Sequence, residues 1–139
     1  MPGPGIALFE ALRQGLGGTL PLIAEDLGFI TQDVHELRHA TGLPGMKILQ
    51  FGFGDGDAHL PHRYDPNTVV YTGTHDNDTA RGWFDHASDE EREAVLAYLG
   101  CDADEVPAGL IRAAYTSVAE TAVVPMQDVL GLGSEARMN

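Results

Sequence analysis

Two short apolar segments of this sequence each end in acidic residues that could perform acid–base chemistry. The run VVYTGTHDND at 69–78 is apolar and β-branched until it reaches His75 and Asp76. The run PLIAEDLG at 21–28 delivers Glu25 in the same way, shortly before a glycine. Paired carboxylates across a cleft are the groups that glycosidic chemistry uses. The repetition therefore favours a site that processes sugars.

Each acid also has a simpler interpretation. A carboxyl group at the rim of an apolar strand is partly desolvated, which favours its protonated form near neutral pH and suits Glu25 to act as a general acid. The alternative is that Glu25 caps a turn or pairs with a lysine. Asp26 points to the other side of the strand, so we expect a structural role for it. His75 and Asp76 are either a charge-stabilising pair or turn residues, because Asp is common where strands end.

Histidines offer competing metal sites, but none has the pattern of a known one. His59 and His62 lie in the segment HLPH, which lacks the glutamate of a zinc-protease helix. His35 and His39 have no third ligand in view. The loop GDGDAH at 54–59 lacks the later glutamate of a calcium loop. We expect no metal and no cofactor, and a metal-dependent hydrolase is kept as a second alternative function.

Length, charge and cysteine content narrow the class of protein. The 139 residues are enough for one ordinary domain. Eight Lys and Arg against 21 Asp and Glu give a net charge of −13, so we expect neither nucleic acid nor a membrane surface as a partner. Cys101 is the only cysteine, which excludes an intrachain disulfide and favours a reducing compartment. Without a signal peptide or an apolar run of roughly 20 residues, the chain is predicted to be cytoplasmic.

The elements that must position the acids alternate between helix and strand. Helical spacing and caps predict helices near 6–16, 31–42, 88–100 and 110–118, and apolar runs predict strands at 20–24, 46–51, 68–72 and within 121–133. Such alternation implies parallel strands with helical crossovers, hence an α/β fold. Functional residues then belong at the carboxyl ends of the strands. The residues at these ends are Glu25, Asp26, Gln50, His75, Asp76 and Asp128.

Four longer segments carry a resemblance to a known family. They are IAEDLG at 23–28, LPGMKILQF at 43–51, YTGTHDNDT at 71–79 and QDVLGLGSEARMN at 127–139. In this order they closely resemble the 4-α-glucanotransferase family, also called amylomaltase or disproportionating enzyme. The resemblance implies a partial (β/α)8 TIM barrel, about the last four β/α units, over residues 1–139. It also implies a retaining transfer of 1,4-α-glucan segments between maltooligosaccharides or starch-like glucan. The even composition of the chain indicates no internal domain boundary.

The resemblance also implies roles for individual residues. Glu25 matches the acid/base of the family, and Asp76 matches the aspartate that stabilises the transition state. His75 matches the histidine that hydrogen-bonds the sugar beside the scissile bond. Three further residues fall where the family contacts the glucan: Phe51, Asp55 and Asn139.

The nucleophile of the family is missing from this sequence. It is an aspartate within an Arg-x-Asp-His segment at the end of an earlier barrel strand, and nothing before Ile23 contains it. RYDP at 63–66 has the Arg-to-Asp spacing but lies in a proline-flanked loop in the wrong order. We therefore expect the C-terminal half of the catalytic barrel, inactive alone. The alternative is a non-catalytic half-barrel that binds glucan or self-associates through its two open sheet edges.

Overall fold

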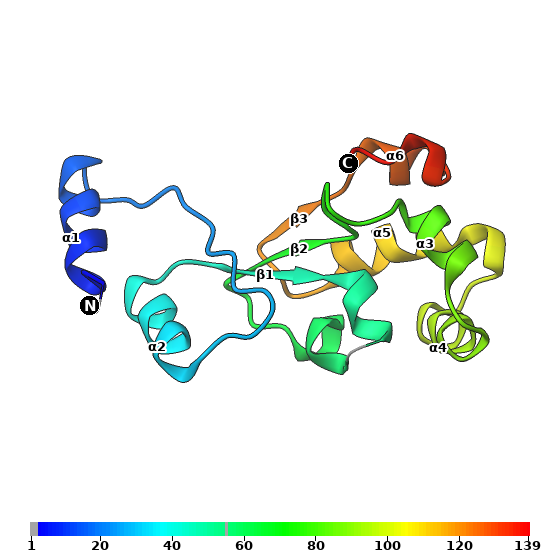
Figure 1. Ribbon diagram of the computed structural model, residues 1–139, viewed down its shortest axis with the longest axis horizontal. Coiled ribbons are helices and arrows are strands. Elements are labelled where there is room, and N and C mark those ends of the chain that lie inside the picture. Colours follow the sequence, from blue (N-terminus) through cyan, green and yellow to red (C-terminus); the bar gives the residue numbers. More distant parts are fainter. Residues whose placement is uncertain (1–2, 55) are drawn as a thin grey trace. The chain divides into compact units, whose positions relative to one another are not determined.

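The structure is a computed structural model that describes residues 3–54 and 56–139. The chain divides into two compact units, Met1–Met46 and Lys47–Asn139. Figure 1 shows helices in the first unit and a mixture of helices and strands in the second. The mixed α/β composition is as predicted.

The first unit contains two predicted helices, α1 (Ile6–Gly15) and α2 (Gln32–Thr41). The Arg13 guanidinium donates a hydrogen bond of 2.7 Å to the carbonyl oxygen of Thr41, which joins the end of one helix to the end of the other. Gly42 closes α2 with a φ of 72°, a left-handed conformation that glycine adopts without steric cost. The apolar residues at helical spacing in α1 do not form a core within this unit, because none of the residues of the helix is buried.

The predicted strand at 20–24 is wrong, since this segment has no regular secondary structure. One ladder-like bond is present, from the Ala24 amide to the Pro44 carbonyl at 2.9 Å. A parallel pair would continue with a bond from the Met46 amide to the Ala24 carbonyl. Instead, the Met46 amide donates to Oδ1 of Asp26 at 2.7 Å. A side-chain carboxylate has replaced the backbone acceptor, which ends the ladder after one bond.

The strands β1 (Gly45–Ile48), β2 (Thr68–Tyr71) and β3 (Thr121–Val123) form the sheet seen in the described residues, in the order β1-β2-β3. The strands β2 and β3 are parallel, with Val70 opposite Ala122. The predicted parallel arrangement is therefore confirmed for this pair. The described residues form one strand fewer than the sequence predicts.

Two of the strands end earlier than predicted. After β1 the chain makes a 3₁₀ turn at Leu49–Phe53, where Gly52 lies so close to Leu60 that a Cβ would come within 2.5 Å of its Cδ2 atom. The strand β3 ends before Pro125, which has no N–H group to donate to a ladder. The next residues form the short helix α6 (Met126–Val129) in place of the predicted strand composition.

Three helices pack around the buried cluster of the second unit: α3 (Ala80–His86), α4 (Asp89–Leu99) and α5 (Val106–Thr116). The helix α4 begins with the predicted capping box of Ser88 and Glu91, whereas α3 was not predicted. The cluster consists of Leu49, Tyr64, Val70, Ala80, Phe84, Val95, Val106, Leu110 and Ala114. Further 3₁₀ turns lie at Asp57–His59, Pro61–Arg63, Ala103–Glu105 and Ser134–Ala136.

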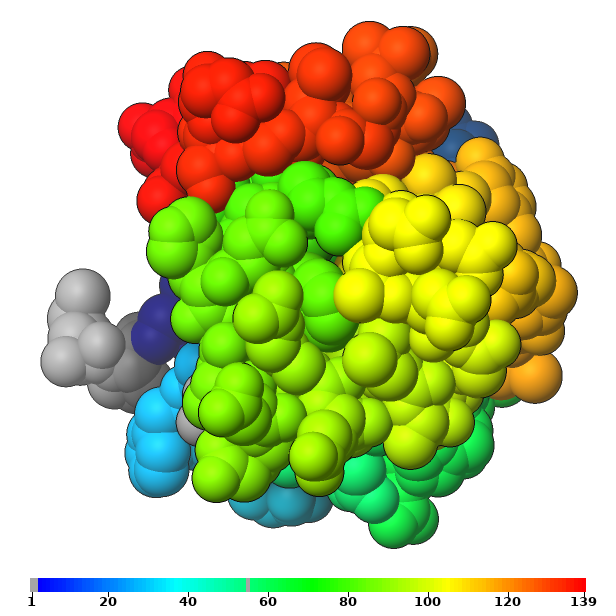
Figure 2. All heavy atoms as spheres, turned by 90° about the vertical axis from the view of Figure 1, so that its right-hand side faces the viewer, coloured from blue at the N-terminus to red at the C-terminus, as the bar shows by residue number. Residues whose placement is uncertain are grey.

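Figure 2 looks onto the helices of the second unit, with α3 and α4 in green to yellow-green and α5 in yellow to orange. The C-terminal residues, in red, lie along one side of this surface and touch α3, in agreement with the contacts between α3 and Ser134–Ala136. Within the described ranges, no helix is both long enough and apolar enough to span a bilayer.

Candidate active site

The Asp76 loop, residues 72–80, connects β2 to α3 and is tied together at its two ends. The carboxylate of Asp128 accepts hydrogen bonds from the Thr72 hydroxyl at 2.5 Å and from the Ala80 amide at 2.7 Å. Asp128 is buried, with 2% of its surface exposed. It was predicted to follow a strand, but it lies in α6 and serves as a structural acceptor. One carboxylate thus links the first and last residues of the loop by hydrogen bonds.

Side-chain amides shape the interior of the Asp76 loop. The buried Gln50 donates from Nε2 to the carbonyl oxygen of Asp78 at 2.9 Å. A Cβ on Gly73 would lie 2.7 Å from the same Nε2 atom, so Gln50 packs directly on the loop backbone. At the tip, Oδ1 of Asn77 accepts bonds from both the amide and the hydroxyl of Thr74, each at 2.9 Å. The turn is therefore held by side chains rather than by backbone bonds alone.

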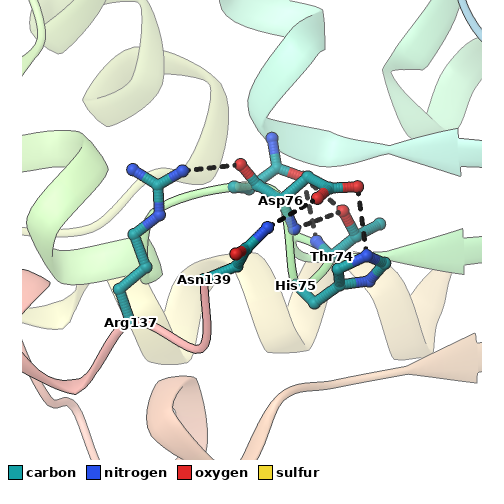
Figure 3. Close-up of polar contacts among 6 residues, drawn as sticks. Thr74, His75, Asp76, Arg137 and Asn139 are labelled. Carbon is teal, nitrogen blue, oxygen red and sulfur yellow. Dashed lines mark hydrogen bonds and ion pairs between the residues drawn. The ribbon is translucent and has the colours of Figure 1, made fainter.

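Asp76 has each of its polar groups in contact with a partner (Figure 3). Its Oδ2 atom is 3.2 Å from Nε2 of His75, and its Oδ1 atom accepts a bond of 3.2 Å from the Asn139 amide. Its backbone N–H donates to the Thr74 hydroxyl at 3.3 Å. Its backbone carbonyl accepts a bond of 3.0 Å from the Arg137 guanidinium. The structure therefore brings together three of the predicted residues, His75, Asp76 and Asn139.

The carboxylate of Asp76 is accessible as well as oriented. The side chains of His75 and Asp76 are 69% and 67% exposed. An exposed contact of this kind between an imidazole and a carboxylate adds little to stability, so the needs of the fold do not explain it. A fixed, accessible carboxylate can accept hydrogen bonds from sugar hydroxyls and offset a positive charge that develops nearby.

The remaining predicted residues lie elsewhere. Glu25 belongs to the first unit, in which its side chain is exposed. Its neighbour Asp26 is fixed by an ion pair with Nε of Arg38 at 3.1 Å, a structural role as expected. Phe51 is 37% exposed and meets the ring of His59 edge-on at 5.5 Å.

Asp55 and the possible metal ligands do not belong to this arrangement. Asp55 was predicted to contact substrate, but it lies outside the described residues. Elsewhere in the chain, within 3–54 and 56–139, no three or more His, Cys, Asp or Glu side chains gather in a way that could hold a metal ion.

Comparison with known proteins identifies the family. The model of the 4-alpha-glucanotransferase family matches residues 1–139, the whole chain. The chain belongs to the 4-alpha-glucanotransferase family. The resemblance in the sequence motifs is thereby confirmed.

Several glucanotransferases are closely similar to this chain. The chloroplastic/amyloplastic 4-alpha-glucanotransferase of Arabidopsis thaliana is 54% identical over 140 residues, which are 99% of this chain and 24% of that protein. The 4-alpha-glucanotransferase of Thermus thermophilus is 49% identical over 146 residues, which are 98% of this chain and 29% of that protein. The chain thus spans about a quarter of the length of these relatives.

Part of a solved amylomaltase structure has the same fold as this chain. The amylomaltase from Streptococcus agalactiae in complex with acarbose superposes with a TM-score of 0.92 at 38% identity. The similarity covers 100% of this chain and 29% of that one.

Sequence reasoning gave no role to several residues that arrange the Asp76 loop. Arg137 lies inside the family motif at 127–139, yet no spacing in the sequence connects it with the backbone of Asp76. Asn77 resembles any polar residue of a turn. Gln50 was placed at the end of a strand, but only the structure reveals its bond to Asp78.

Proposed function

We propose that this chain contributes to a 4-α-glucanotransferase that transfers 1,4-α-glucan segments between maltooligosaccharides with retention of configuration. The observation that carries this proposal is the oriented, accessible carboxylate of Asp76, flanked by His75 and Asn139, in a chain that belongs to this family. The amylomaltase of similar fold was solved with acarbose bound, which supports a glucan or maltooligosaccharide as the substrate.

In this proposal the two acids have complementary roles. Glu25 protonates the glycosidic oxygen as its bond to the sugar breaks, and later takes the proton of the incoming acceptor hydroxyl. Asp76 binds sugar hydroxyls and offsets the positive charge of the oxocarbenium-like transition state. His75 lies against Asp76 and donates a hydrogen bond to the sugar beside the scissile bond. Transfer rather than hydrolysis requires that water be excluded from the glycosyl-enzyme intermediate.

Three further residues are proposed to contact the glucan: Phe51, Asp55 and Asn139. The partly exposed ring of Phe51 offers an apolar face against which a sugar ring can pack. Asn139 bonds Asp76 through its amide, so its own carbonyl oxygen stays available as an acceptor for a sugar hydroxyl.

We further propose that residues 1–139 correspond to about the last four β/α units of a (β/α)8 barrel and that the chain alone is inactive. The alternation of helix and strand and the parallel pair of β2 and β3 support the barrel assignment. Inactivity follows because the Arg-x-Asp-His segment with the attacking aspartate does not occur in this sequence. We also propose a cytoplasmic location, because a single cysteine cannot form an intrachain disulfide and so favours a reducing compartment.

The experiment compares the 139-residue chain with a chimera, in which this chain replaces the matching segment of the Thermus thermophilus relative. We expect the chain alone to show no disproportionation of maltotriose and the chimera to be active. In the chimera, Glu25→Gln and Asp76→Asn should each lower kcat about 100-fold or more. Activity of the chain alone that Glu25→Gln abolishes would refute the proposed inactivity. A chimera indifferent to both substitutions would refute the proposed roles.

A second candidate function is a half-barrel that self-associates or binds glucan without catalysis. The observation that favours it is the exposure of large apolar side chains on α6 and beside it, with Met126 at 64%, Val129 at 56% and Leu130 at 63%. Light scattering after size exclusion, together with calorimetry with maltoheptaose, tests this candidate. A monomer that binds no maltoheptaose would rule it out.

A further inference from the structure

The C-terminal segment, residues 134–139, is fastened to the Asp76 loop at several points. The Ser134 hydroxyl donates a hydrogen bond of 2.6 Å to Oδ2 of Asp78. The Gln127 amide of α6 donates to the carbonyl oxygen of Ala136 at 3.2 Å, which gives the segment a second attachment. Arg137 extends from this anchored segment to the tip of the loop, as Figure 3 shows. The backbone that carries Arg137 is therefore itself held by hydrogen bonds on the way to Asp76.

The atom that Arg137 contacts decides what this residue can do. Its Nη2 atom bonds the backbone carbonyl of Asp76 and not the carboxylate. A bidentate bond to the carboxylate would have neutralised it and occupied both of its oxygens. A bond to the carbonyl fixes the peptide plane that follows Asp76 and leaves the negative charge available. Arginine suits this role because its guanidinium is planar and always charged.

Different neighbours fix the backbone and the carboxylate of Asp76. Thr74 holds its backbone N–H and Arg137 its backbone carbonyl, so both peptide groups that flank the residue are fixed. His75 and Asn139 then set the direction of the carboxylate itself. Of these four partners, Arg137 carries the one full positive charge that does not depend on pH near neutrality.

We propose that Arg137 is a positioning residue for the reaction: it holds the backbone of Asp76 so that the carboxylate faces the charge that develops on the sugar. This proposal rests on the proposed function, because it assumes that Asp76 stabilises the transition state. Arg137 acts through Asp76 and contributes nothing to the rate when that carboxylate is absent. The loss of Arg137 therefore lowers the rate of the reaction more than the binding of the glucan.

The test measures maltotriose disproportionation by the chimera defined above, with Arg137→Ala, Arg137→Lys and Arg112→Ala. Arg112 is the matched control, because its Nη2 atom also donates to a backbone carbonyl, that of Leu99, at 3.1 Å. We expect Arg137→Ala to lower kcat about tenfold with KM changed less than about twofold, because a small misplacement of a catalytic group costs rate rather than binding. Arg137→Lys should recover part of kcat, and Arg112→Ala should match the parent.

A double-mutant cycle separates positioning from a general structural effect. In an Asp76→Asn background, removal of Arg137 should lower the residual kcat by less than about twofold, since the group it positions is already lost. An equal loss in both backgrounds would overturn the proposal. So would a parent kcat unaffected by Arg137→Ala, or a loss that appears in KM alone.

Amide hydrogen exchange on the 139-residue chain provides a second measurement that needs no activity. Arg137→Ala should speed exchange of the Asp76 and Asn77 amides at least about fivefold, and Arg112→Ala should leave them unchanged, because exchange reports local opening of the loop. Unchanged exchange with Arg137→Ala would contradict the proposal even if the chimera were inactive. Failure of the proposed function has a different signature, which is an active chimera that tolerates Asp76→Asn.

Discussion

At the scale of single residues, the buried carboxylate of Asp128 links the two ends of the Asp76 loop. It accepts bonds from the Thr72 hydroxyl and the Ala80 amide. We expect Asp128→Ala to lower the free energy of unfolding by about 3 kcal/mol, because two buried donors lose their acceptor. Urea denaturation followed by circular dichroism measures this loss. The exposed Asp65→Ala is the control, with an expected change within about 0.5 kcal/mol, and an equal effect of the two substitutions would contradict the prediction.

Cys101 provides a prediction of pH dependence. Burial is the largest cause that raises the pKa of its thiol above the ordinary value of 9.0, while the charge of Arg112 lowers it. The rate of alkylation by iodoacetamide should therefore reach its midpoint above pH 9.0. Arg112→Ala should move the midpoint higher, and Cys101→Ser should abolish labelling. A midpoint at or below 9.0 would be inconsistent with burial of the thiol.

The same shift has a definite sign for stability. The folded chain holds the thiol proton to a higher pH than the unfolded chain does, because the folded pKa is the higher of the two. The contribution of Cys101 to stability is therefore complete below the unfolded pKa. It is lost as the pH rises through the folded value.

The sequence predicts the chemistry of individual residues better than their surroundings. His75, Asp76 and Asn139 could be singled out by type and motif, and the structure places them in contact. The sequence does not show that Glu25 is exposed or that Asp128 faces inward, because burial depends on which elements pack over a position. The bond between Arg137 and Asp76 joins residues 61 positions apart, a distance over which local patterns carry no information.

At the scale of elements, the close packing of α3 against the C-terminal segment depends on Gly82. A Cβ at this position would collide with the Ser134 hydroxyl and lie 2.7 Å from Oδ1 of Asp78. We expect Gly82→Ala to destabilise the chain by about 2 kcal/mol, because the overpacked contact must open. Gly15→Ala in α1 is the matched control. It meets no atom within 4 Å and should be neutral or stabilise by about 0.5 kcal/mol.

Thermal melting of both glycine variants checks this prediction. A Gly82→Ala variant as stable as the Gly15→Ala variant would show that Ser134 can move away from Asp78 without cost. In the chimera, the same substitution should also reduce activity, because it disturbs the segment that supports Arg137 and Asn139.

Elements with strong local signals were predicted correctly, and those decided by a single tertiary contact were not. The helix α4 begins with a capping box that can be read from the sequence, and α2 ends at a glycine, which is a common signal for a helix end. In contrast, the segment at 20–24 has the composition of a strand, but the Asp26 side chain takes the amide that would have continued the ladder. The turn after β1 depends on Leu60 packing against Gly52, a contact absent from any local pattern.

At the scale of the whole molecule, the buried cluster lies entirely in the second unit. All of its residues follow Lys47, whereas α1 buries none of its own. We expect the amides of α1 to exchange with solvent orders of magnitude faster than those of Val70 and Val95, because exchange protection follows burial. Mass spectrometry of peptides from the labelled chain measures both. Equal protection of the two units would contradict this expectation, and protection of α1 that grows with protein concentration would indicate self-association.

The closure of the Asp76 loop by Asp128 has a practical consequence for protein engineering. Thr72 and Ala80 are both bonded to one carboxylate, so the loop between them must span a fixed distance with a fixed number of residues. Substitutions that keep the length of the loop leave both attachment points intact. Insertions or deletions would have to break one of them. Loop variants should therefore keep the original length, with Thr72, Ala80 and Asp128 unchanged as the frame.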